Sequence, residues 1–467
     1  MREIECDVAV IGAGTAGIAA YRAAAEAGAH AVLIERGPGG TTCARVGCMP
    51  SKLLIAAGEA AHAARGADLF GVRVSGVAVD GPAVLARLRA ERDRFVGAVF
   101  DSLDAIPADR RIAGHARFRD RGSLAVGDAC IVRYRAAVIA TGSSPAVPEP
   151  LRGLGARVLT TDTLFEIPNL PASLAVLGLG PVGIELAQAL ARLGVRVTAL
   201  DSGRTIAGLT EPDLVGQAAA LFADAMDLHL GARLDAAEAA EGGVRLSWTC
   251  DGASGATSGS ATVERVLAAA GRPPNIRDLG LETTGLRLDA DGMPAFDARS
   301  LVCADAPILI AGDADGWRPV LHEASRQGRI AGANAAALAA GRSTQAPEPW
   351  PSLAMVFTHP QAAAFGAPYD PDARDRITGS ADFSDQGRAR VEGVNRGGIR
   401  LWAGRDGRLF GGEMFGPAVE HLAHLLSGAL RDGLTAQALR DRPIYHPTVE
   451  EGVETALSEI IRKVSAE

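Results

Sequence analysis

The chain has 467 residues and a formal net charge of −8, so it is too long for one hydrophobic core and several domains are expected. The acidic balance and the lack of any lysine- or arginine-rich block disfavour nucleic acid as a partner. Six cysteines do not make a disulfide scaffold, and no apolar run is long enough for a signal peptide or a membrane span. We therefore expect a cytoplasmic protein without a membrane or nucleic-acid partner.

Residues 6–35 predict a strand–helix–strand unit that binds a dinucleotide. Gly12, Gly14 and Gly17 follow the first strand and open an alanine-rich helix, and the second strand ends in Glu35, 23 residues after the first glycine. Glycines allow a pyrophosphate to approach the helix N-terminus, and the acid accepts from a ribose hydroxyl. A lone GxGxxG occurs by chance, but this structural context favours the dinucleotide interpretation over a purely structural one.

The segment GTTCARVGCMPSK places Cys43 and Cys48 close together, just after that unit. Isolated cysteines usually behave as small buried residues, but two of them with a lysine inside ten residues indicate a redox pair. In a regular helix residues five apart lie roughly 8–9 Å apart at Cα, whereas a disulfide needs about 4.4–6.8 Å. We therefore expect a break at the start of a helix, at Gly47 or Pro50. The helix dipole and the positive charges of Arg45 and Lys52 would stabilise a thiolate there.

The next part of the chain predicts an amphipathic helix over 80–106 and short strands over 112–140. A second fingerprint follows, with Gly178, Gly180 and Gly183 opening a helix. Asp201 again ends a strand 23 residues after the first glycine. Two complete fingerprints with matched spacing imply two dinucleotides on one polypeptide. Asp201 favours a free 2′-hydroxyl and hence NAD, while the nearby Arg204 leaves NADP open.

Beyond a hairpin with the polar tip DGASGATSGS and the boundary APEPWP, the remainder predicts a final α/β domain. There His446 precedes a proline and two acids, Glu450 and Glu451, which suits a general base held in one tautomer. Standing alone, the motif would be more typical of a surface histidine. We expect no metal site, because no metal-ligand cluster surrounds the other histidines.

Together these motifs resemble the flavoprotein disulfide reductases of the pyridine nucleotide-disulfide oxidoreductase family, and among them most closely the dihydrolipoyl dehydrogenases. The resemblance covers nearly the whole chain. It implies an α/β fold with two Rossmann-like domains, for FAD and NAD, and a C-terminal α/β dimerisation domain. The implied domains are 1–145 (FAD-binding, with the redox disulfide), 146–267 (NAD-binding), 268–343 (central, completing the FAD site) and 344–467 (dimerisation).

The same resemblance implies which residues hold the cofactors. AGHARF is similar to the segment that lies on the FAD adenine, IATGSSP to the loop that closes the FAD domain, and LIAGD to the strand whose aspartate holds the ribityl chain. AAGRPPN is similar to the partner loop of the NAD unit. The implied residues are Gly12, Gly14, Gly17, Glu35, Lys52, His115, Ala116, Thr141, Gly142 and Asp313 for FAD, and Gly178, Gly180, Gly183, Asp201 and Gly271 for NAD.

Catalytic roles are implied in the same way. Cys43 would be the interchange thiol that meets the substrate, and Cys48 the thiolate in charge-transfer contact with the flavin. Lys52 would pair with Glu185 beside flavin N5. His446 would be the acid–base group, oriented by Glu451 and supplied by the other subunit, which makes a homodimer obligatory.

Departures from the family pattern concern the substrate more than the chemistry. Thr41 stands where the family has a glycine, Arg45 replaces an asparagine between the cysteines, and Glu450 adds a second acid beside Glu451. The departures leave open whether Glu450 or Glu451 orients His446, and which disulfide is the substrate.

The function implied by the resemblance is FAD-dependent oxidation of protein-bound dihydrolipoyl groups with NAD+. One alternative is a glutathione-reductase-like reduction of a low-molecular-weight disulfide with NADPH, against which Asp201 speaks. A mercuric reductase is disfavoured because SEIIRKVSAE carries no cysteine pair, and a transhydrogenase or oxidase because both redox cysteines are present. A catalytically silent flavoprotein subunit of a multienzyme assembly is disfavoured because every catalytic group is retained.

Overall fold

The computed structural model describes residues 2–128, 130–252, 255–304 and 306–466. It divides the chain into two compact units, and each is described here by itself. The four-domain division stays a prediction. The first unit comprises Met1–Pro50, Ala90–Ala146 and Arg272–Pro349, and the second Ser51–Arg89, Val147–Gly271 and Trp350–Glu467.

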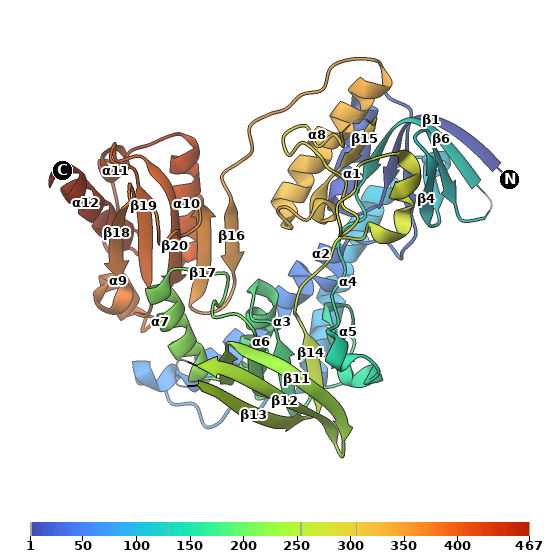
Figure 1. The fold of residues 1–467 in the computed structure, drawn as a ribbon. Helices are drawn as coiled ribbons and strands as arrows, with labels where there is room; N and C mark the ends of the chain where they lie inside the picture. Colours follow the sequence, from blue (N-terminus) through green and yellow to red (C-terminus); the bar gives the residue numbers. More distant parts are fainter. Residues whose placement is uncertain (1, 129, 253–254, 305, 467) are drawn as a thin grey trace. The chain divides into compact units, whose positions relative to one another are not determined.

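A seven-stranded sheet forms the centre of the first unit (Figure 1). Strand β6 pairs along one edge with β1, in parallel; its other edge pairs antiparallel with β5 and then, nearer its end, parallel with β15. Residues that the sequence assigns to the FAD site lie at or just after the ends of β1, β2, β6 and β15. Because these four strands run parallel, their ends meet at one edge of the sheet. The strands are β1 (Arg2–Ile11), β2 (Ala31–Glu35), β3 (Arg111–Ala113), β4 (Ala116–Asp120), β5 (Ser123–Val126), β6 (Cys130–Ile139) and β15 (Ile308–Ile310).

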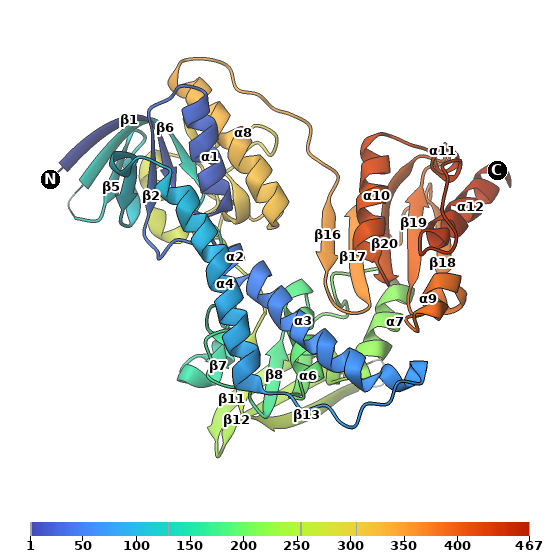
Figure 2. The same cartoon turned by 180° about the vertical axis from the view of Figure 1, so that it is seen from behind.

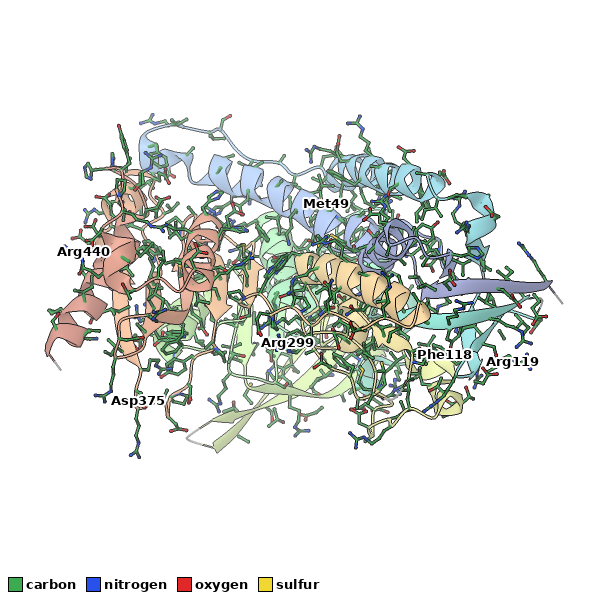
Figure 3. All side chains as sticks on the ribbon, turned by 90° about the horizontal axis from the view of Figure 1, so that it is seen from above. Met49, Phe118, Arg119, Arg299, Asp375 and Arg440 are labelled. Carbon is green, nitrogen blue, oxygen red and sulfur yellow. The ribbon has the colours of Figure 1, made fainter. Side chains whose placement is uncertain are left out.

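Helices α1 (Thr15–Glu26) and α8 (Leu321–Ala339) lie side by side in this unit (Figure 1, Figure 2). Their close contact requires glycine, because a Cβ added to Gly328 would stand 2.2 Å from the Ala16 carbonyl oxygen. On β4 the alternation is clear: Phe118 is buried and Arg119 is exposed (Figure 3). This is the period-two pattern of a strand with one face on the core.

The second unit contains a parallel five-stranded sheet in the order β10-β9-β8-β14-β7, next to an antiparallel three-stranded sheet. Strand β13 begins at Gly255, so most of the predicted hairpin tip over 251–260 is strand instead; residues 253–254 of that tip lie outside the described part. The strands are β7 (Val158–Leu159), β8 (Ser173–Leu177), β9 (Arg196–Asp201), β10 (Asp227–Leu230), β11 (Ala232–Ala240), β12 (Gly243–Gly252), β13 (Gly255–Val263) and β14 (Arg265–Ala268).

An antiparallel sheet of five strands forms the C-terminal part of this unit, in the order β16-β17-β20-β19-β18. Helices α10 (Val419–Arg431) and α12 (Glu451–Ala466) pack on it over a shared apolar core. A Cβ on Gly379 would stand 2.1 Å from the Ala456 carbonyl oxygen, so α12 lies almost against β18. The strands are β16 (Leu353–Val356), β17 (Gln361–Gly366), β18 (Ile377–Asp382), β19 (Gly398–Ala403) and β20 (Leu409–Gly416).

The predicted α/β class is confirmed by these sheets and helices, and the predicted amphipathic helix over 80–106 is α4. In the described part of the chain, no helix combines the length and apolar character needed to cross a bilayer. The remaining helices are α2 (Thr42–Val46), α3 (Cys48–Arg65), α4 (Gly81–Asp104), α5 (Thr161–Leu164), α6 (Pro181–Arg192), α7 (Pro212–Ala223), α9 (Gly387–Val391) and α11 (Ala436–Arg440).

Candidate active site

The first fingerprint forms a tight turn between β1 and α1. Gly12 has φ 103°, and a Cβ there would stand 2.3 Å from the Ala140 carbonyl oxygen, so no larger residue fits. A Cβ on Gly14, by contrast, would meet nothing within 4 Å, which leaves the helix N-terminus open to a ligand. Glu35 accepts hydrogen bonds from the backbone nitrogens of Ala13 and Gly37, both at 2.6 Å.

The second fingerprint repeats this geometry within the other unit. Gly178 has φ 94°, and a Cβ there would stand 2.5 Å from the Ala269 carbonyl oxygen. Asp201 accepts from the backbone nitrogens of Leu179 at 2.5 Å and Gly203 at 2.7 Å. Each carboxylate therefore braces its own glycine loop and keeps acceptor capacity for a further donor, because an ionised carboxylate has about four lone-pair sites.

Polar groups of the first unit gather around Ser143, after the end of β6. Its hydroxyl donates to Asp313 at 2.9 Å, while its carbonyl accepts from the Arg272 guanidinium at 3.1 Å. Two buried polar atoms in the same unit, Thr141 Oγ1 and His115 Nε2, have no hydrogen-bond partner among the described residues. Buried polar atoms are nearly always paired, so these two atoms fit a site that receives a polar ligand.

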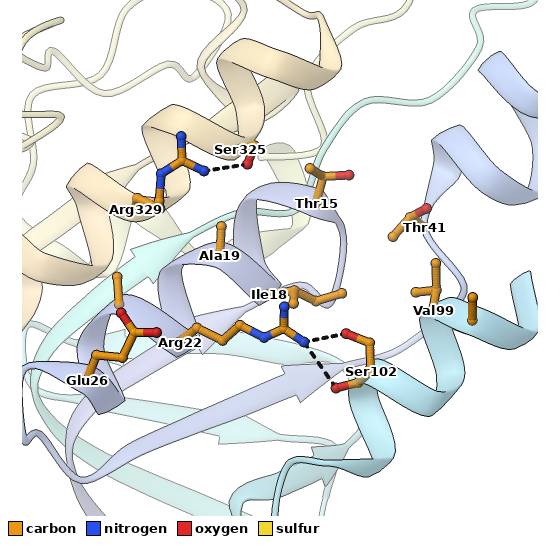
Figure 4. A pocket seen from close by; sticks show the side chains of 12 residues that line it. Thr15, Ile18, Ala19, Arg22, Glu26, Thr41, Val99, Ser102, Ser325 and Arg329 are labelled. Atoms are coloured by element: carbon orange, nitrogen blue, oxygen red, sulfur yellow. Dashed lines mark hydrogen bonds between the residues drawn. The ribbon is translucent and has the colours of Figure 1, made fainter. Parts of the chain in front are cut away.

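A cavity of about 460 Å³ runs along the outer face of α1, between α4 and α8 (Figure 4). Thr15 and Thr41 lie at its lining, the first at the start of α1 and the second just before the cysteines. Its two arginines are occupied: Arg22 donates to Ser102, and Arg329 donates to Ser325 at 2.8 Å. Both arginines of the cavity are therefore engaged, and Glu26 is the other charged residue among those that line it.

Cys43 and Cys48 lie on two successive helices, and the helix break expected between them is present, although a second helix takes the place of the expected loop. Cys43 belongs to the short α2, Cys48 begins the longer α3, and the break between them falls at Gly47. A Cβ on Gly47 would stand 3.2 Å from the Cys43 Cα, so the residue directly before Cys48 lies close to Cys43. Pro50 sits in the first turn of α3, where its missing N–H costs no hydrogen bond.

Thr41, the departure before the cysteines, adopts φ 56° and ψ 148°. This region is essentially restricted to glycine, so the backbone is strained at a residue two positions before Cys43. The threonine hydroxyl accepts from the Ala44 backbone nitrogen at 3.2 Å and caps α2. Arg45, the second departure, has a buried Nε without a hydrogen-bond partner in the described structure.

Lys52 and Glu185 form an ion pair in the second unit, with Nζ 2.7 Å from Oε2. The carboxylate is buried and the ammonium is about one-third exposed. Phe357 contacts both partners: its backbone nitrogen donates to Glu185 Oε1 at 2.8 Å, and Lys52 Nζ lies 4.6 Å from its ring centroid. Sequence reasoning missed this third member because Phe357 lies 172 residues from Glu185 and no local spacing links the two.

His446 pairs with Glu451, whose Oε1 lies 2.8 Å from the imidazole Nδ1. The other oxygen of Glu451 accepts from the Thr448 backbone nitrogen at 3.1 Å. The hydrogen bond with His446 lowers the pKa of Glu451 below its usual value, and the bond from Thr448 lowers it further. A carboxylate at Nδ1 leaves Nε2 as the basic nitrogen. The His446 side chain is 80% exposed within this chain.

Comparison with known proteins agrees with this arrangement. Residues 6–328 match the family model described as pyridine nucleotide-disulphide oxidoreductase, and residues 352–457 match the dimerisation domain of the same family. The chain belongs to the pyridine nucleotide-disulphide oxidoreductases. The match of the C-terminal part indicates a homodimer.

Named relatives of this oxidoreductase differ in activity. A mercuric reductase of Acidithiobacillus ferrooxidans is 32% identical over 98% of this chain and 83% of its own. Dihydrolipoyl dehydrogenase 3 of Pseudomonas aeruginosa is 31% identical over 97% of both chains. The HOCl-induced flavoprotein disulfide reductase RclA of Escherichia coli shares the fold, with TM-score 0.81 and 23% identity over 97% of this chain and 99% of its own.

Family membership implies FAD and a pyridine nucleotide as cofactors. The first unit fits FAD on its own evidence: a glycine cradle open at Gly14, a braced Glu35, and the unpartnered atoms of Thr141 and His115. Asp313, bonded to Ser143, is placed at the same sheet edge by β15. The second fingerprint, with Gly180 and Gly183 opening α6 and Gly271 after β14, provides the nucleotide unit of the other part.

Proposed function

We propose that this oxidoreductase is an NAD-linked dihydrolipoyl dehydrogenase that acts through a Cys43–Cys48 disulfide. The preference for NAD over NADP rests on one observation, which is that Asp201 and Glu35 are bound to their glycine loops in the same way. Each carboxylate accepts two backbone N–H bonds from its own loop, so each retains acceptor sites suited to ribose hydroxyls. A 2′-phosphate at Asp201 would meet a carboxylate of like charge.

The pair His446–Glu451 supports a dithiol substrate. With Glu451 at Nδ1, the Nε2 of His446 takes the proton of one dihydrolipoyl thiol. The resulting thiolate attacks Cys43 Sγ, the Cys43–Cys48 bond breaks, and Cys48 leaves as a thiolate. The second substrate thiol then displaces Cys43, which leaves with the proton of that thiol; this closes the lipoyl disulfide and leaves both enzyme cysteines reduced.

FAD, when bound, supplies the two-electron carrier between the reduced cysteines and NAD+. The sum is one dihydrolipoyl group and NAD+ converted to one lipoyl group, NADH and a proton. In the homodimer, the exposed His446 would serve the cysteines of the partner subunit.

Steady-state assays test this proposal. We expect turnover of dihydrolipoamide with NAD+ to exceed turnover of glutathione disulfide with NADPH, and of Hg(II) with NADPH. Separate titrations with NADH and NADPH should show tighter binding of NADH. A clear preference for NADPH, or faster turnover in either of the other assays, would replace the proposed substrate while leaving the family assignment intact.

A further inference from the structure

We propose that the Phe357–Pro360 loop of the C-terminal part is a positioning element that holds the Lys52–Glu185 ion pair in one geometry. The tuning of the flavin by this pair rests on the proposed function, whereas the geometry of the loop does not. All residues involved belong to the second unit.

Phe357 contacts each member of the pair with a different group. Its backbone N–H bonds Glu185 Oε1, so the carboxylate cannot rotate without losing either this bond or the one to Lys52. Its ring lies under the ammonium, with Nζ 4.6 Å from the ring centroid, a geometry in which the electron-rich ring face attracts the cation. Without the loop, Glu185 would be a buried carboxylate with a single partner, which is costly.

The loop is itself clamped to α6 one turn further on. The Gln188 amide donates to the His359 carbonyl at 2.9 Å and accepts from the His359 backbone nitrogen at 2.8 Å. Arg192 adds a bond to the same carbonyl at 2.7 Å and is paired with Glu59 on α3. Three buried polar side chains of α6, spaced at i, i+3 and i+7, therefore bind the loop backbone.

A row of three buried polar side chains is unexpected in a helix that is otherwise buried and apolar, because each buried polar group needs a hydrogen-bond partner. Helices α3 and α6 approach closely here, since a Cβ on Gly58 would stand 3.0 Å from the Ala189 carbonyl oxygen. The clamp therefore ties together α3, which carries Lys52, α6, which carries Glu185, and the loop after β16.

Composition adds an independent indication that the ammonium of Lys52 matters. Only two of the 47 lysines and arginines are lysines, Lys52 and Lys463. Arginine serves nearly every other cationic position, but its broad planar fork cannot replace a compact point charge. A lysine retained here, and held by ring and carboxylate, fits a site that requires a defined ammonium position.

The scarcity of lysine also permits a direct test. In a Lys463→Arg background, isotope-labelled lysine reports Lys52 alone. We expect its ε-methylene protons to be shifted upfield by the Phe357 ring, and Phe357→Leu, which keeps the backbone N–H, to abolish that shift. Phe95→Leu, a matched change in the other unit, should leave it in place. Gln188→Ala, which touches neither partner, should also diminish it by releasing the loop.

A second readout concerns the bound flavin. We expect Phe357→Leu to lower its two-electron reduction potential by about 30 mV, a tenfold change in the equilibrium constant, with Phe95→Leu unchanged. An unchanged Lys52 signal in Phe357→Leu would overturn the positioning role, and a lost shift with an unchanged potential would overturn the tuning. Failure of the dihydrolipoamide assay would affect neither result, because it concerns only the substrate.

Discussion

The imidazole Nδ1 of His446 lies 2.8 Å from Oε1 of Glu451 and thereby distinguishes between two adjacent acids. Glu450 instead accepts backbone bonds at its carbonyl, from Val453 and Glu454. We expect Glu451→Gln to lower kcat for dihydrolipoamide oxidation about tenfold or more, because the tautomer is no longer imposed. Glu450→Gln is the matched control and should retain wild-type kcat; the opposite order would assign the role to Glu450.

His446 itself should matter more than its orienting acid. His446→Gln is expected to slow dithiol oxidation by roughly 10²–10⁴, the usual share of general acid–base catalysis. Bound FAD, measured by its absorbance, should be unaffected, because His446 belongs to none of the motifs assigned to the FAD site. Turnover close to wild type would show that another group takes the thiol proton.

The two cysteines should differ in their effect on the spectrum of the reduced enzyme. With NADH or dithionite under anaerobic conditions, the two-electron-reduced protein is expected to show a long-wavelength band. Cys48→Ser should abolish this band, whereas Cys43→Ser should keep it, because the family resemblance assigns the flavin contact to Cys48 and the substrate contact to Cys43. Cys130→Ser serves as a control on β6. Absence of the band in the wild type would argue against a redox disulfide altogether.

Thr41 offers a test of backbone strain near the active site. Its φ of 56° with ψ of 148° costs on the order of 1–3 kcal/mol for a residue other than glycine. Thr41→Gly removes the strain, and glycine is itself tolerated as an N-cap, so we expect a gain of about 1 kcal/mol in the free energy of unfolding. Thr41→Ala keeps the strain and loses the cap, so it should destabilise by about 1 kcal/mol. Urea unfolding of the two variants measures both.

Asp315 predicts a dependence of stability on pH. Burial raises its pKa to about 6, and its Oδ2 has no partner in the described structure. The folded state binds more protons than the unfolded state between about pH 4 and 6, so this group lowers the free energy of unfolding as pH rises through that range, by up to about 3 kcal/mol. Asp315→Asn should remove the decline and stabilise the protein at neutral pH.

Asp297 serves as the control for this prediction, because its pKa is shifted in the opposite direction from that of Asp315. Hydrogen bonds from Ser300 hold the pKa of Asp297 below its usual value. The stabilisation that Asp297 provides is fully present above the pKa of this group in the unfolded chain. It is lost as pH falls through the lower pKa of the folded state. Asp297→Asn should therefore destabilise at neutral pH. Equal pH profiles for the two variants and the wild type would contradict both assignments.

Much of the fold was predictable because its signals are local. The last glycine of each fingerprint closes its turn locally, because a Cβ on Gly17 or Gly183 would stand 1.7 or 1.8 Å from the carbonyl oxygen of the glycine five residues earlier. The following acid returns at a fixed spacing to brace the same turn. The helix break at Gly47 follows equally from geometry over five residues. The polar segment over 255–260 was wrongly predicted as a loop, because pairing with β12 outweighs its weak intrinsic preference.

By itself the sequence determined two dinucleotide units, a cysteine pair at a helix start and a histidine near two acids. Only the tertiary structure decided which acid pairs with His446, that Thr41 is strained, and that Phe357 contacts both Lys52 and Glu185. Spacing along the chain governs sterics within a turn or a helix. Contacts such as Phe357 to Glu185, 172 residues apart, depend instead on where packing of whole helices and sheets returns the chain.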